Sequence, residues 1–290
     1  MRRSELAELA RTGERKPKAR RRAEPAASLI LRDGRAAGKD ASIAVEAPVA
    51  LAYNDTPHVV MMASPGDLPD FALGFSLSEG ILAGAEEMLG MAIEEGEIGI
   101  RIAMTIPRGR FAVLQKRRRN LAGRTGCGLC GVDDLTQIVR PIPPVASGIS
   151  IDEGAIHRAL EALPDHQVLN RQTGAVHAAG WADPTGALVI VREDVGRHNA
   201  LDKLIGAMAR EAIDPQRGFA VITSRCSFEM VQKTASFGIP ILVAISAPTT
   251  MALRIARECD MTLVALARSD SVTLYANPRR VRGLAGEDAR

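Results

Sequence analysis

Uninterrupted apolar runs alternate with helical patterns in the second half of this chain, and the alternation limits the fold more than any other feature. The apolar runs have the length of buried strands and span residues 188–191, 219–223, 241–245 and 262–266. The helical patterns between them lie at residues 199–209, 228–237 and 250–259. Apolar strands joined by helices predict a largely parallel sheet that is covered on both faces. We therefore expect an α/β fold here.

The first half of the chain predicts a smaller α+β unit. A helical pattern runs from Leu68 to Leu82, and Asp67 is in place to cap it. Short β-like runs precede the pattern, at residues 43–45, 49–51 and 59–62. Short strands next to one amphipathic helix indicate a unit separate from the larger sheet.

A proline-rich connector separates the two halves. Because proline cannot continue a helix, Pro141-Ile-Pro-Pro144 ends the preceding segment. Beyond it, Ser150-Ile-Asp-Glu153 matches a capping box and predicts a helix to about Leu163. We expect a disordered basic tail, a small N-terminal α+β domain, a mobile cysteine loop and an α/β domain, at residues 1–27, 28–115, 116–135 and 136–290.

The positive charge of the chain is concentrated at its N-terminus. The whole chain of 290 residues has a net charge of +3 and a pI near 8.8, while residues 1–24 hold nine Arg or Lys against four Glu. The remaining residues are therefore slightly acidic. A segment rich in Arg and Ala without apolar periodicity cannot bury enough surface to offset its ordering entropy, so we expect a solvated tail and no nucleic-acid partner.

The sequence predicts a cytoplasmic protein. The longest apolar run, residues 239–247, contains Pro240 and is far shorter than the roughly 20 residues that span a bilayer, so no membrane partner is expected. Arg2-Arg3 is followed by charged residues and not by the apolar core of an export signal. Four cysteines without a leader favour a reducing compartment over a disulfide scaffold.

Two cysteines lie close together in a glycine-rich segment. Cys127 and Cys130 belong to Gly123-Arg-Thr-Gly-Cys-Gly-Leu-Cys-Gly131, which follows the basic run Lys116-Arg-Arg-Arg119. Four glycines in nine residues oppose regular structure, so we expect the mobile loop here. Neighbouring Arg and Lys side chains lower the pKa of a thiol and favour the reactive thiolate. The sequence therefore places the chemistry on this loop.

Polar residues follow every predicted strand of the larger sheet. Ligands of α/β sheets bind beyond the carboxyl ends of the strands. Arginines occur after three of the four strands, at Arg192 and Arg197, at Arg225 and at Arg268. Arginine binds phosphate, and the N-termini of the following helices also favour anions. This pattern predicts a phosphate-bearing ligand at the sheet edge.

Three motifs, in this order, resemble the formate dehydrogenase accessory sulfurtransferases, the FdhD family. They are the cysteine segment 123–131, Glu193-Asp-Val-Gly-Arg-His-Asn-Ala-Leu-Asp-Lys203, and Gly238-Ile-Pro-Ile241 followed by Ser246-Ala-Pro-Thr249. The resemblance runs from about Glu46 to Tyr275. The sequence departs from the family at Ala175 and Ser224, where glycine is usual.

The resemblance implies a sulfur carrier. Such a protein accepts a persulfide from a cysteine desulfurase and passes the sulfur to the molybdenum bis-molybdopterin guanine dinucleotide cofactor before the cofactor enters formate dehydrogenase. It implies Cys127 as the nucleophile and Cys130 in support. It also implies a homodimer, no permanently bound metal and a cytidine-deaminase-like three-layer α/β/α domain. The implied cofactor contacts are Leu266, Ala267, Arg268, Ser269, Asp270 and Ser271.

Other classes of protein fit the residues less well. A zinc site needs more ligands than one Cys-x-x-Cys supplies, and a zinc deaminase would have Glu where Ala179 stands. A thiol-disulfide oxidoreductase using Cys127 and Cys130 is the main alternative, although its cysteines would stand where a strand enters a helix. A non-catalytic scaffold that binds acidic partners through the basic loop would tolerate loss of Cys127.

The remaining reactive side chains have structural explanations. His177 and His198 could act in acid–base chemistry or hold loops, and His198 is spaced to pair along its helix with Asp194 or Asp202. Asp202 and Lys203 are expected to cap or pair within the same helix. Cys226 and Cys259 are expected to be small buried residues.

Overall fold

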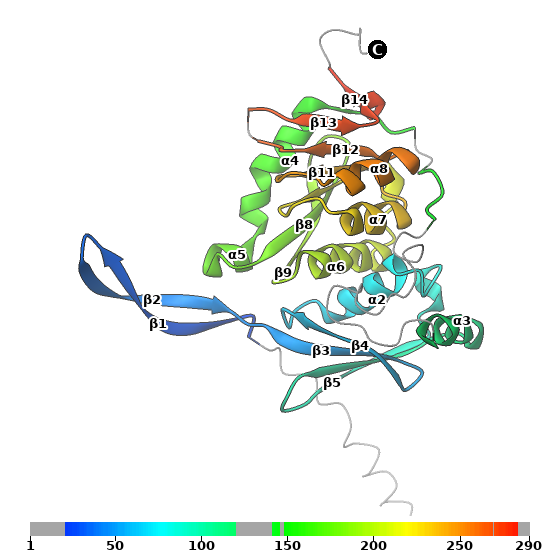
Figure 1. The fold of residues 1–290 in the computed structure, drawn as a ribbon, viewed down its shortest axis with the longest axis horizontal. Helices are drawn as coiled ribbons and strands as arrows, with labels where there is room; N and C mark the ends of the chain where they lie inside the picture. The colour runs from blue at the N-terminus through cyan, green and yellow to red at the C-terminus, as the bar shows by residue number, and fades with distance from the viewer. Residues whose placement is uncertain (1–20, 120–140, 146–147, 269, 284–290) are drawn as a thin grey trace, which may run out of the picture.

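The computed structural model describes residues 21–119, 141–145, 148–268 and 270–283 (Figure 1). These residues form a small sheet with two helices, a large sheet with helices on both faces, and a projecting hairpin. The expectation of a mixed α/β protein is confirmed. No helix among the described residues has the length and apolar character to cross a bilayer.

The N-terminal sheet has four strands in the order β4-β3-β6-β5. Their bounds are β3 Ala47–Tyr53, β4 Thr56–Ala63, β5 Gly90–Glu95 and β6 Ile100–Thr105. Strand β3 pairs in parallel with β6, and both other neighbouring pairs are antiparallel. Helix α2, Leu68–Ser78, buries Phe71 and Phe75 against this sheet. Helix α3, Arg108–Arg119, follows β6.

The C-terminal sheet has six strands in the order β13-β12-β11-β10-β8-β9. Their bounds are β8 His177–Ala182, β9 Leu188–Asp194, β10 Phe219–Ile222, β11 Ile241–Ala244, β12 Thr262–Ala265 and β13 Thr273–Ala276. Strands β10, β11 and β12 are parallel, whereas β8 and β13 run against their neighbours. Strand β9 therefore points the same way as β10, so the carboxyl ends of four strands share one edge.

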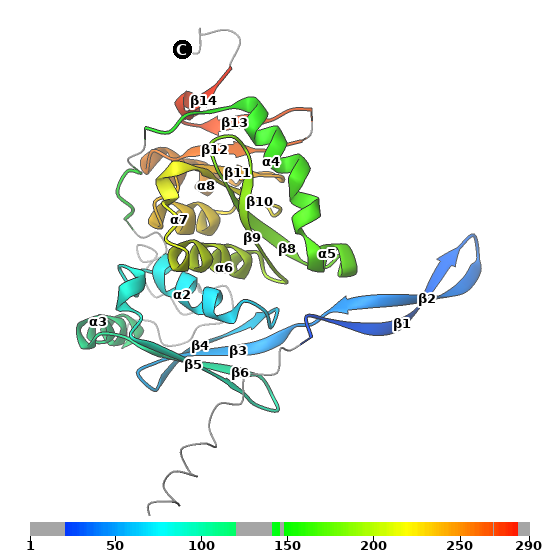
Figure 2. The same ribbon diagram turned by 180° about the vertical axis from the view of Figure 1, so that it is seen from behind.

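Helices cover both faces of the C-terminal sheet (Figures 1 and 2). Their bounds are α4 Glu153–His166, α5 Val168–Thr173, α6 Arg197–Arg210, α7 Phe228–Ser236 and α8 Thr250–Glu258. Alternate strand residues face opposite layers: Ala220 and Leu242 pack with α6, α7 and α8, while Phe219 and Val243 pack with α4. A short parallel pair, β7 Ile151–Asp152 and β14 Val281–Arg282, lies beside α4.

The chain enters the fold through a long β-hairpin. Strand β1, Ala23–Arg32, pairs along its whole length with β2, Arg35–Ala44, and the hairpin projects away from the body (Figure 1). Asp33 and Gly34 form the turn, and both have positive φ angles, of 49° and 74°, as a type I′ turn requires. Strand β1 begins at Ala23, inside the segment 1–27 that the sequence assigned to a disordered tail.

Several predicted boundaries differ from the structure. Asp152, and not Ser150, caps α4, and its side chain accepts from the Ala155 amide at 2.7 Å. The predicted capping box is therefore wrong, because β7 holds residues 151–152 extended against β14. Asp67 occupies the N-cap of α2 in a left-handed conformation but accepts from Arg22 instead of capping. Helix α3 continues through residues 116–119, which the sequence assigned to the mobile loop.

Helices α2 and α6 join the two sheets at a close crossing. A Cβ on Gly74 of α2 would overlap the carbonyl oxygen of Asp202, and a Cβ on Gly206 of α6 would overlap that of Asp70. Only glycine allows two helix backbones to approach this closely. The crossing therefore fixes how the N-terminal sheet lies against the C-terminal one.

Replacing Gly74 by alanine should destabilise the protein, because the added methyl group has no space between the two backbones. We expect a loss of about 3 kcal/mol in the free energy of unfolding, as strong overpacking in a core produces. Urea denaturation followed by circular dichroism measures it. The control is Gly109→Ala in α3, where a Cβ meets nothing within 4 Å. Equal stability of the two variants would contradict the crossing.

Candidate functional site

The loops after β10, β11 and β12 are joined into one rim at the carboxyl edge of the large sheet. The Cys226 amide donates to the Ala247 carbonyl at 3.1 Å, and the Thr249 amide donates to the Cys226 carbonyl at 3.0 Å. The Leu266 amide donates to the Ser246 carbonyl at 3.3 Å. These bonds connect three loops that lie far apart in the sequence.

The loop after β12 presents Arg268 on this rim. Leu266 has a positive φ of 50°, which turns the chain out of the strand, and Ala267 is buried. The Arg268 amide then donates to the Ser271 carbonyl at 2.7 Å and closes a turn. The exposed Arg268 side chain donates through Nη1 to the Ile245 carbonyl at 2.9 Å. Its other guanidinium donors form no hydrogen bond with the described residues and could bind an anion.

Two further predicted residues lie on the same rim. Arg225, after β10, is exposed, and Asp270 is exposed and accepts from the Ser271 hydroxyl at 3.1 Å. Ser269 lies outside the described residues. The rim therefore carries Arg225 on one loop and Arg268, Asp270 and Ser271 on another.

Arg192 and Arg197 differ in their positions. Arg192 does not reach the rim, because its Nε donates to the buried carboxylate of Asp70 in α2 at 2.8 Å. Arg197 is the first residue of α6, and its buried Nε has no hydrogen-bond partner among the described residues. A cation in the first turn opposes the helix dipole, so this end of α6 suits a bound anion.

Two histidines lie close to Arg197. His177 opens β8 opposite Asp194, and its Nδ1 is 3.4 Å from the Thr223 hydroxyl. Burial lowers the pKa of His177, and the nearby charges of Arg197 and His198 lower it further. His198 Nε2 lies 2.9 Å from a carboxylate oxygen of Glu229 in α7. The expected pairing of His198 along its own helix is therefore wrong.

The cysteines fall into two groups. Cys127 and Cys130, the predicted nucleophile and its supporting thiol, lie outside the described residues. Cys226 and Cys259 are buried, as expected. Burial raises the pKa of the Cys226 thiol to about 12 and also raises that of Cys259. Neither of these two buried thiols forms a thiolate near neutral pH, so both are poor nucleophiles.

The charged residues of the segment 193–203 hold the two sheets together. Lys203 is fully buried, and its Nζ lies 2.6 Å from a carboxylate oxygen of Asp194 and donates to the Ser64 carbonyl at 2.9 Å. Asp194 in turn accepts from the Ser64 amide at 3.0 Å. Burial lowers the pKa of Lys203, although the charge of Asp194 opposes this shift. The pair thus ties α6 to the chain leaving β4.

Asp202 forms a second buried link. It accepts from Lys233 of α7 at 3.0 Å and from the Ser78 hydroxyl of α2 at 2.6 Å. Burial opposes the charge on Lys233, but Asp202 and Glu79 outweigh burial and raise its pKa. The expectation that Asp202 and Lys203 pair within their own helix is therefore wrong. Asp202 and Lys203 carry opposite charges and lie between the apolar Leu201 and Leu204. This pattern was the signal in the sequence that both charged side chains are buried.

Glu193 has a structural contact of its own. Its buried carboxylate accepts from the amides of Leu169 at 2.7 Å and Asn170 at 2.8 Å, in the first turn of α5. A carboxylate at a helix N-terminus satisfies amides that have no partner within the helix. Glu193 is therefore a distant cap for α5 and not a rim residue.

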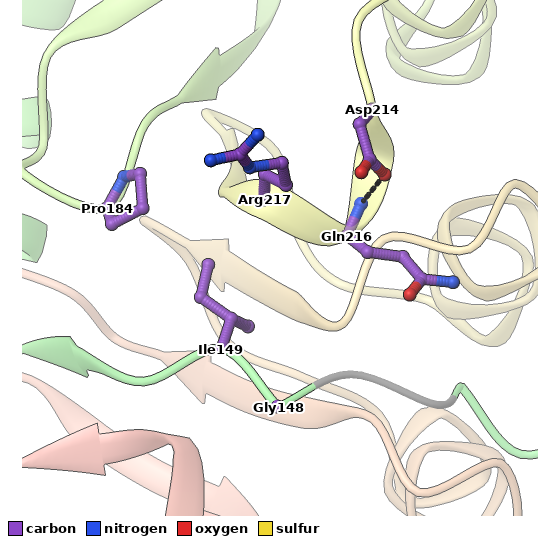
Figure 3. A pocket seen from close by; sticks show the side chains of 6 residues that line it. All are labelled: Gly148, Ile149, Pro184, Asp214, Gln216 and Arg217. Carbon is purple, nitrogen blue, oxygen red and sulfur yellow. Dashed lines mark hydrogen bonds between the residues drawn. The ribbon is translucent and has the colours of Figure 1, made fainter.

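Two cavities among the described residues lie away from the rim. A depression of about 340 Å³ lies at the opposite edge of the sheet, and Figure 3 shows Pro184, Arg217 and Ile149 among the side chains that line it. A second cavity, of about 530 Å³, lies between α2 and the C-terminal ends of α6 and α7 and is lined by Leu77, Ala209 and others. Neither contains the rim arginines. The described residues contain no cluster of three His, Cys, Asp or Glu that could hold a metal ion.

The fold and the rim define a mixed α/β protein whose larger sheet carries an arginine-bearing loop rim at one edge. The chain belongs to the FdhD/NarQ family, whose model matches residues 44–282. This match confirms the resemblance found in the sequence.

The relatives of the chain cover most of its length. A protein from Bordetella bronchiseptica named sulfur carrier protein FdhD is 50% identical over 246 residues, which are 85% of this chain and 89% of the relative. One of the same name from Xanthomonas axonopodis pv. citri is 51% identical over 250 residues, 86% of this chain and 89% of the relative. The crystal structure of a formate dehydrogenase accessory protein from Desulfotalea psychrophila matches with a TM-score of 0.69 and 27% identity, over 89% of this chain and 99% of that one.

Replacing Lys203 by methionine should destabilise the protein, because the carboxylate of Asp194 then remains buried without its cation. We expect a loss of about 3–5 kcal/mol in the free energy of unfolding, as breaking a buried ion pair produces. The double variant Lys203→Met/Asp194→Asn removes both charges and should recover part of this loss. Urea denaturation measures all three proteins. A double variant less stable than the single one would show that the buried pair is not the cause.

Proposed function

We propose that this protein is a sulfur carrier that serves formate dehydrogenase. It accepts a persulfide from a cysteine desulfurase on Cys127 and delivers the sulfur to the molybdenum bis-molybdopterin guanine dinucleotide cofactor. The observation that carries the proposal is the 50% identity, over 85% of this chain, to a protein named as a sulfur carrier. The arginine rim supports it, because the cofactor is a large anion with two phosphates on each of its nucleotide arms.

The first step is an exchange between sulfur atoms. The Cys127 thiolate attacks the outer sulfur of the persulfide on the desulfurase, a new sulfur–sulfur bond forms, and the cysteine of the desulfurase leaves as a thiolate. Cys226 and Cys259 do not compete, since burial raises the pKa of both thiols. Cys130 is placed in the sequence to assist Cys127. The basic residues that precede the two cysteines favour the thiolate.

The cofactor, as substrate, would lie on the rim. Arg225 and Arg268 are exposed there, and the N-terminus of α8 begins beside them. In our proposal, residues 266–271 meet the guanine-nucleotide part of the ligand, and Arg197 supplies a further cation at α6. Arg192 has no part in binding, because it is paired with Asp70.

The fold type, the location in the cell and the oligomeric state belong to the same proposal. The six-stranded sheet, with β8 antiparallel beside three parallel strands and helices on both faces, supports a cytidine-deaminase-like arrangement. We propose a cytoplasmic homodimer that meets the desulfurase and formate dehydrogenase in turn.

Cys127→Ala should abolish sulfur uptake, because the variant lacks the proposed nucleophile, Cys130 only assists it in this proposal, and burial disfavours the thiolates of Cys226 and Cys259. Intact mass spectrometry after incubation with a cysteine desulfurase and cysteine should show a gain of one reducible sulfur atom on the native protein and none on the variant. Cys259→Ala is the matched control and should still gain sulfur. A native protein that forms a disulfide and gains no sulfur would instead indicate a thiol-disulfide oxidoreductase.

Arg268→Ala should weaken binding of guanosine diphosphate, because the variant loses a charged hydrogen-bond donor at the rim. We expect the dissociation constant to rise about tenfold, which corresponds to roughly 1.5 kcal/mol. Isothermal titration calorimetry measures the constant. Arg254→Ala serves as control, since that exposed arginine lies along α8 beside Glu258. Equal losses in the two variants would remove Arg268 from the site.

A further inference from the structure

The N-terminal ends of helices α6 and α7 lie side by side at the carboxyl edge of the large sheet. Each helix follows a strand that ends at this edge, β9 for α6 and β10 for α7. His198 and Glu229 are the second residues of the two helices, and His198 Nε2 lies 2.9 Å from a carboxylate oxygen of Glu229. The two first turns are therefore in contact. We call residues 196–199 and 227–229 together the α6–α7 junction.

Ser227 occupies the N-cap of α7 but does not cap the helix. Serine is favoured at this position because its hydroxyl normally accepts a hydrogen bond from an amide of the first turn. The Ser227 hydroxyl oxygen is buried, makes no capping hydrogen bond and has no partner among the described residues. A buried hydroxyl without a partner costs free energy. Ser227 therefore brings an unused hydroxyl group to the junction.

Arg197, the first residue of α6, brings a second buried group. Its Nε is buried and has no hydrogen-bond partner within the described ranges of the chain. A buried guanidinium donor without a partner costs more free energy than a neutral one. Together with Ser227, Arg197 gives the junction two buried side-chain groups that can donate to a ligand.

The backbone of the junction supplies further donors. The N-cap of α6 is Gly196, which has no side chain that could cap the helix. The amides of Arg197, His198, Phe228 and Glu229 have no hydrogen-bond partner in the part of the chain that the structure describes. The first amides of a helix also carry the positive end of its dipole. These donors favour a ligand that carries negative charge and accepts hydrogen bonds.

The charges around the junction agree with an anionic ligand. Each acidic side chain of the adjoining sequence has a partner: Glu229 faces His198, Asp194 pairs with Lys203 at 2.6 Å, and Glu193 accepts from two amides of α5. Arg197 and the exposed Arg225, two residues before Ser227, form no ion pair with any described residue. The positive charge left over at this end of the sheet is therefore that of two arginines.

We propose that the α6–α7 junction binds a phosphate oxyanion. Arg197 Nε, the Ser227 hydroxyl and the first amides of both helices donate, and the oxyanion accepts from all of them. The junction is separate from the loop that carries Arg268. That loop follows β12, which is two strands from β10 and so roughly 10 Å away along the sheet edge. A single phosphate group is too small to contact both places.

The source of the phosphate follows from the proposed function. A guanine nucleotide with its base near Arg268 would carry its phosphates along the sheet edge toward the junction. The inference rests on the proposed function for this source alone. The donors of the junction also suit free phosphate, and the experiment below distinguishes the two.

Two probes test the site on the full chain. Isothermal titration calorimetry measures binding of guanosine diphosphate. The rise of the urea midpoint in sodium sulfate, relative to sodium chloride of equal ionic strength, measures binding of a free tetrahedral oxyanion. Arg197→Met/Ser227→Ala removes both side-chain donors and keeps the apolar stem of residue 197. We expect the dissociation constant of guanosine diphosphate to rise about tenfold or more, and the sulfate response to fall below that of the native protein.

A matched pair of substitutions away from the junction is the control. Arg254→Met/Ser236→Ala replaces an exposed arginine of α8 and the exposed last residue of α7, and it should respond as the native protein does. Weaker binding of guanosine diphosphate at the junction variant assigns the site to a nucleotide phosphate. A loss of the sulfate response alone assigns it to free phosphate. Two unchanged responses, or a native protein that responds to neither probe, would overturn the site.

Ser227→Ala alone separates a ligand group from a helix cap. Because the Ser227 hydroxyl has no partner, its removal should leave the urea midpoint without ligand at the native value or raise it. Thr249→Ala is the comparison, since the Thr249 hydroxyl caps α8 by accepting from the Ala252 amide at 3.3 Å, and it should lower the midpoint. A midpoint lowered by Ser227→Ala as well would show a structural cap and remove Ser227 from the site.

A failure of this site is distinguishable from a failure of the proposed function. The two probes read anion binding and unfolding, whereas mass spectrometry reads sulfur uptake on Cys127. A native protein that takes up no sulfur but binds both probes would keep the oxyanion site and lose the carrier function. A native protein that takes up sulfur and binds neither probe would do the reverse.

Discussion

The buried charges of α6 are the constraint on which the rest of the structure depends. Moving a charge out of water costs several kcal/mol, and a partner with complete hydrogen bonds is needed to offset that cost. The partners of Lys203 and Asp202 come from β9, α2, α7 and the chain after β4. The charges are therefore satisfied only when both sheets are in place. At the glycine crossing, the backbones of α2 and α6 lie in direct contact. The N-terminal sheet and the C-terminal sheet therefore have one relative position.

The sequence predicted the parts of the fold that depend on local pattern. Apolar runs and helical periodicity located β9 to β12 and α6 to α8 to within a few residues, because each of these elements buries a face that the sequence shows directly. The direction of β8 and β13 could not be predicted, since it depends on pairing with strands that are distant in the chain. The same limit applies to Arg192, whose partner Asp70 is 122 residues away.

Short-range chemistry misled the prediction where a long-range contact competes with it. Ser150 and Glu153 match a capping box, but pairing of β7 with β14 moves the cap to Asp152. Asp202 and His198 are spaced for pairing along α6, yet each is matched by a side chain of α7. A local hydrogen bond at the surface contributes little free energy, so losing it costs little. A buried polar group that lacks a partner costs more free energy, so the long-range contact prevails.

The rim differs from these structural contacts in one physical respect. Lys203, Asp202 and Glu193 are satisfied by the protein itself, so they need no ligand. Arg197 opposes the dipole at the start of α6 and keeps a buried Nε without a partner among the described residues. Exposed Arg268 uses one of its donors on the backbone. A side chain whose charge or hydrogen-bond donors are not satisfied by the fold is expected at a functional position. Within the described part of the chain these cations are not fully matched by the fold, and in our proposal an anionic cofactor matches them.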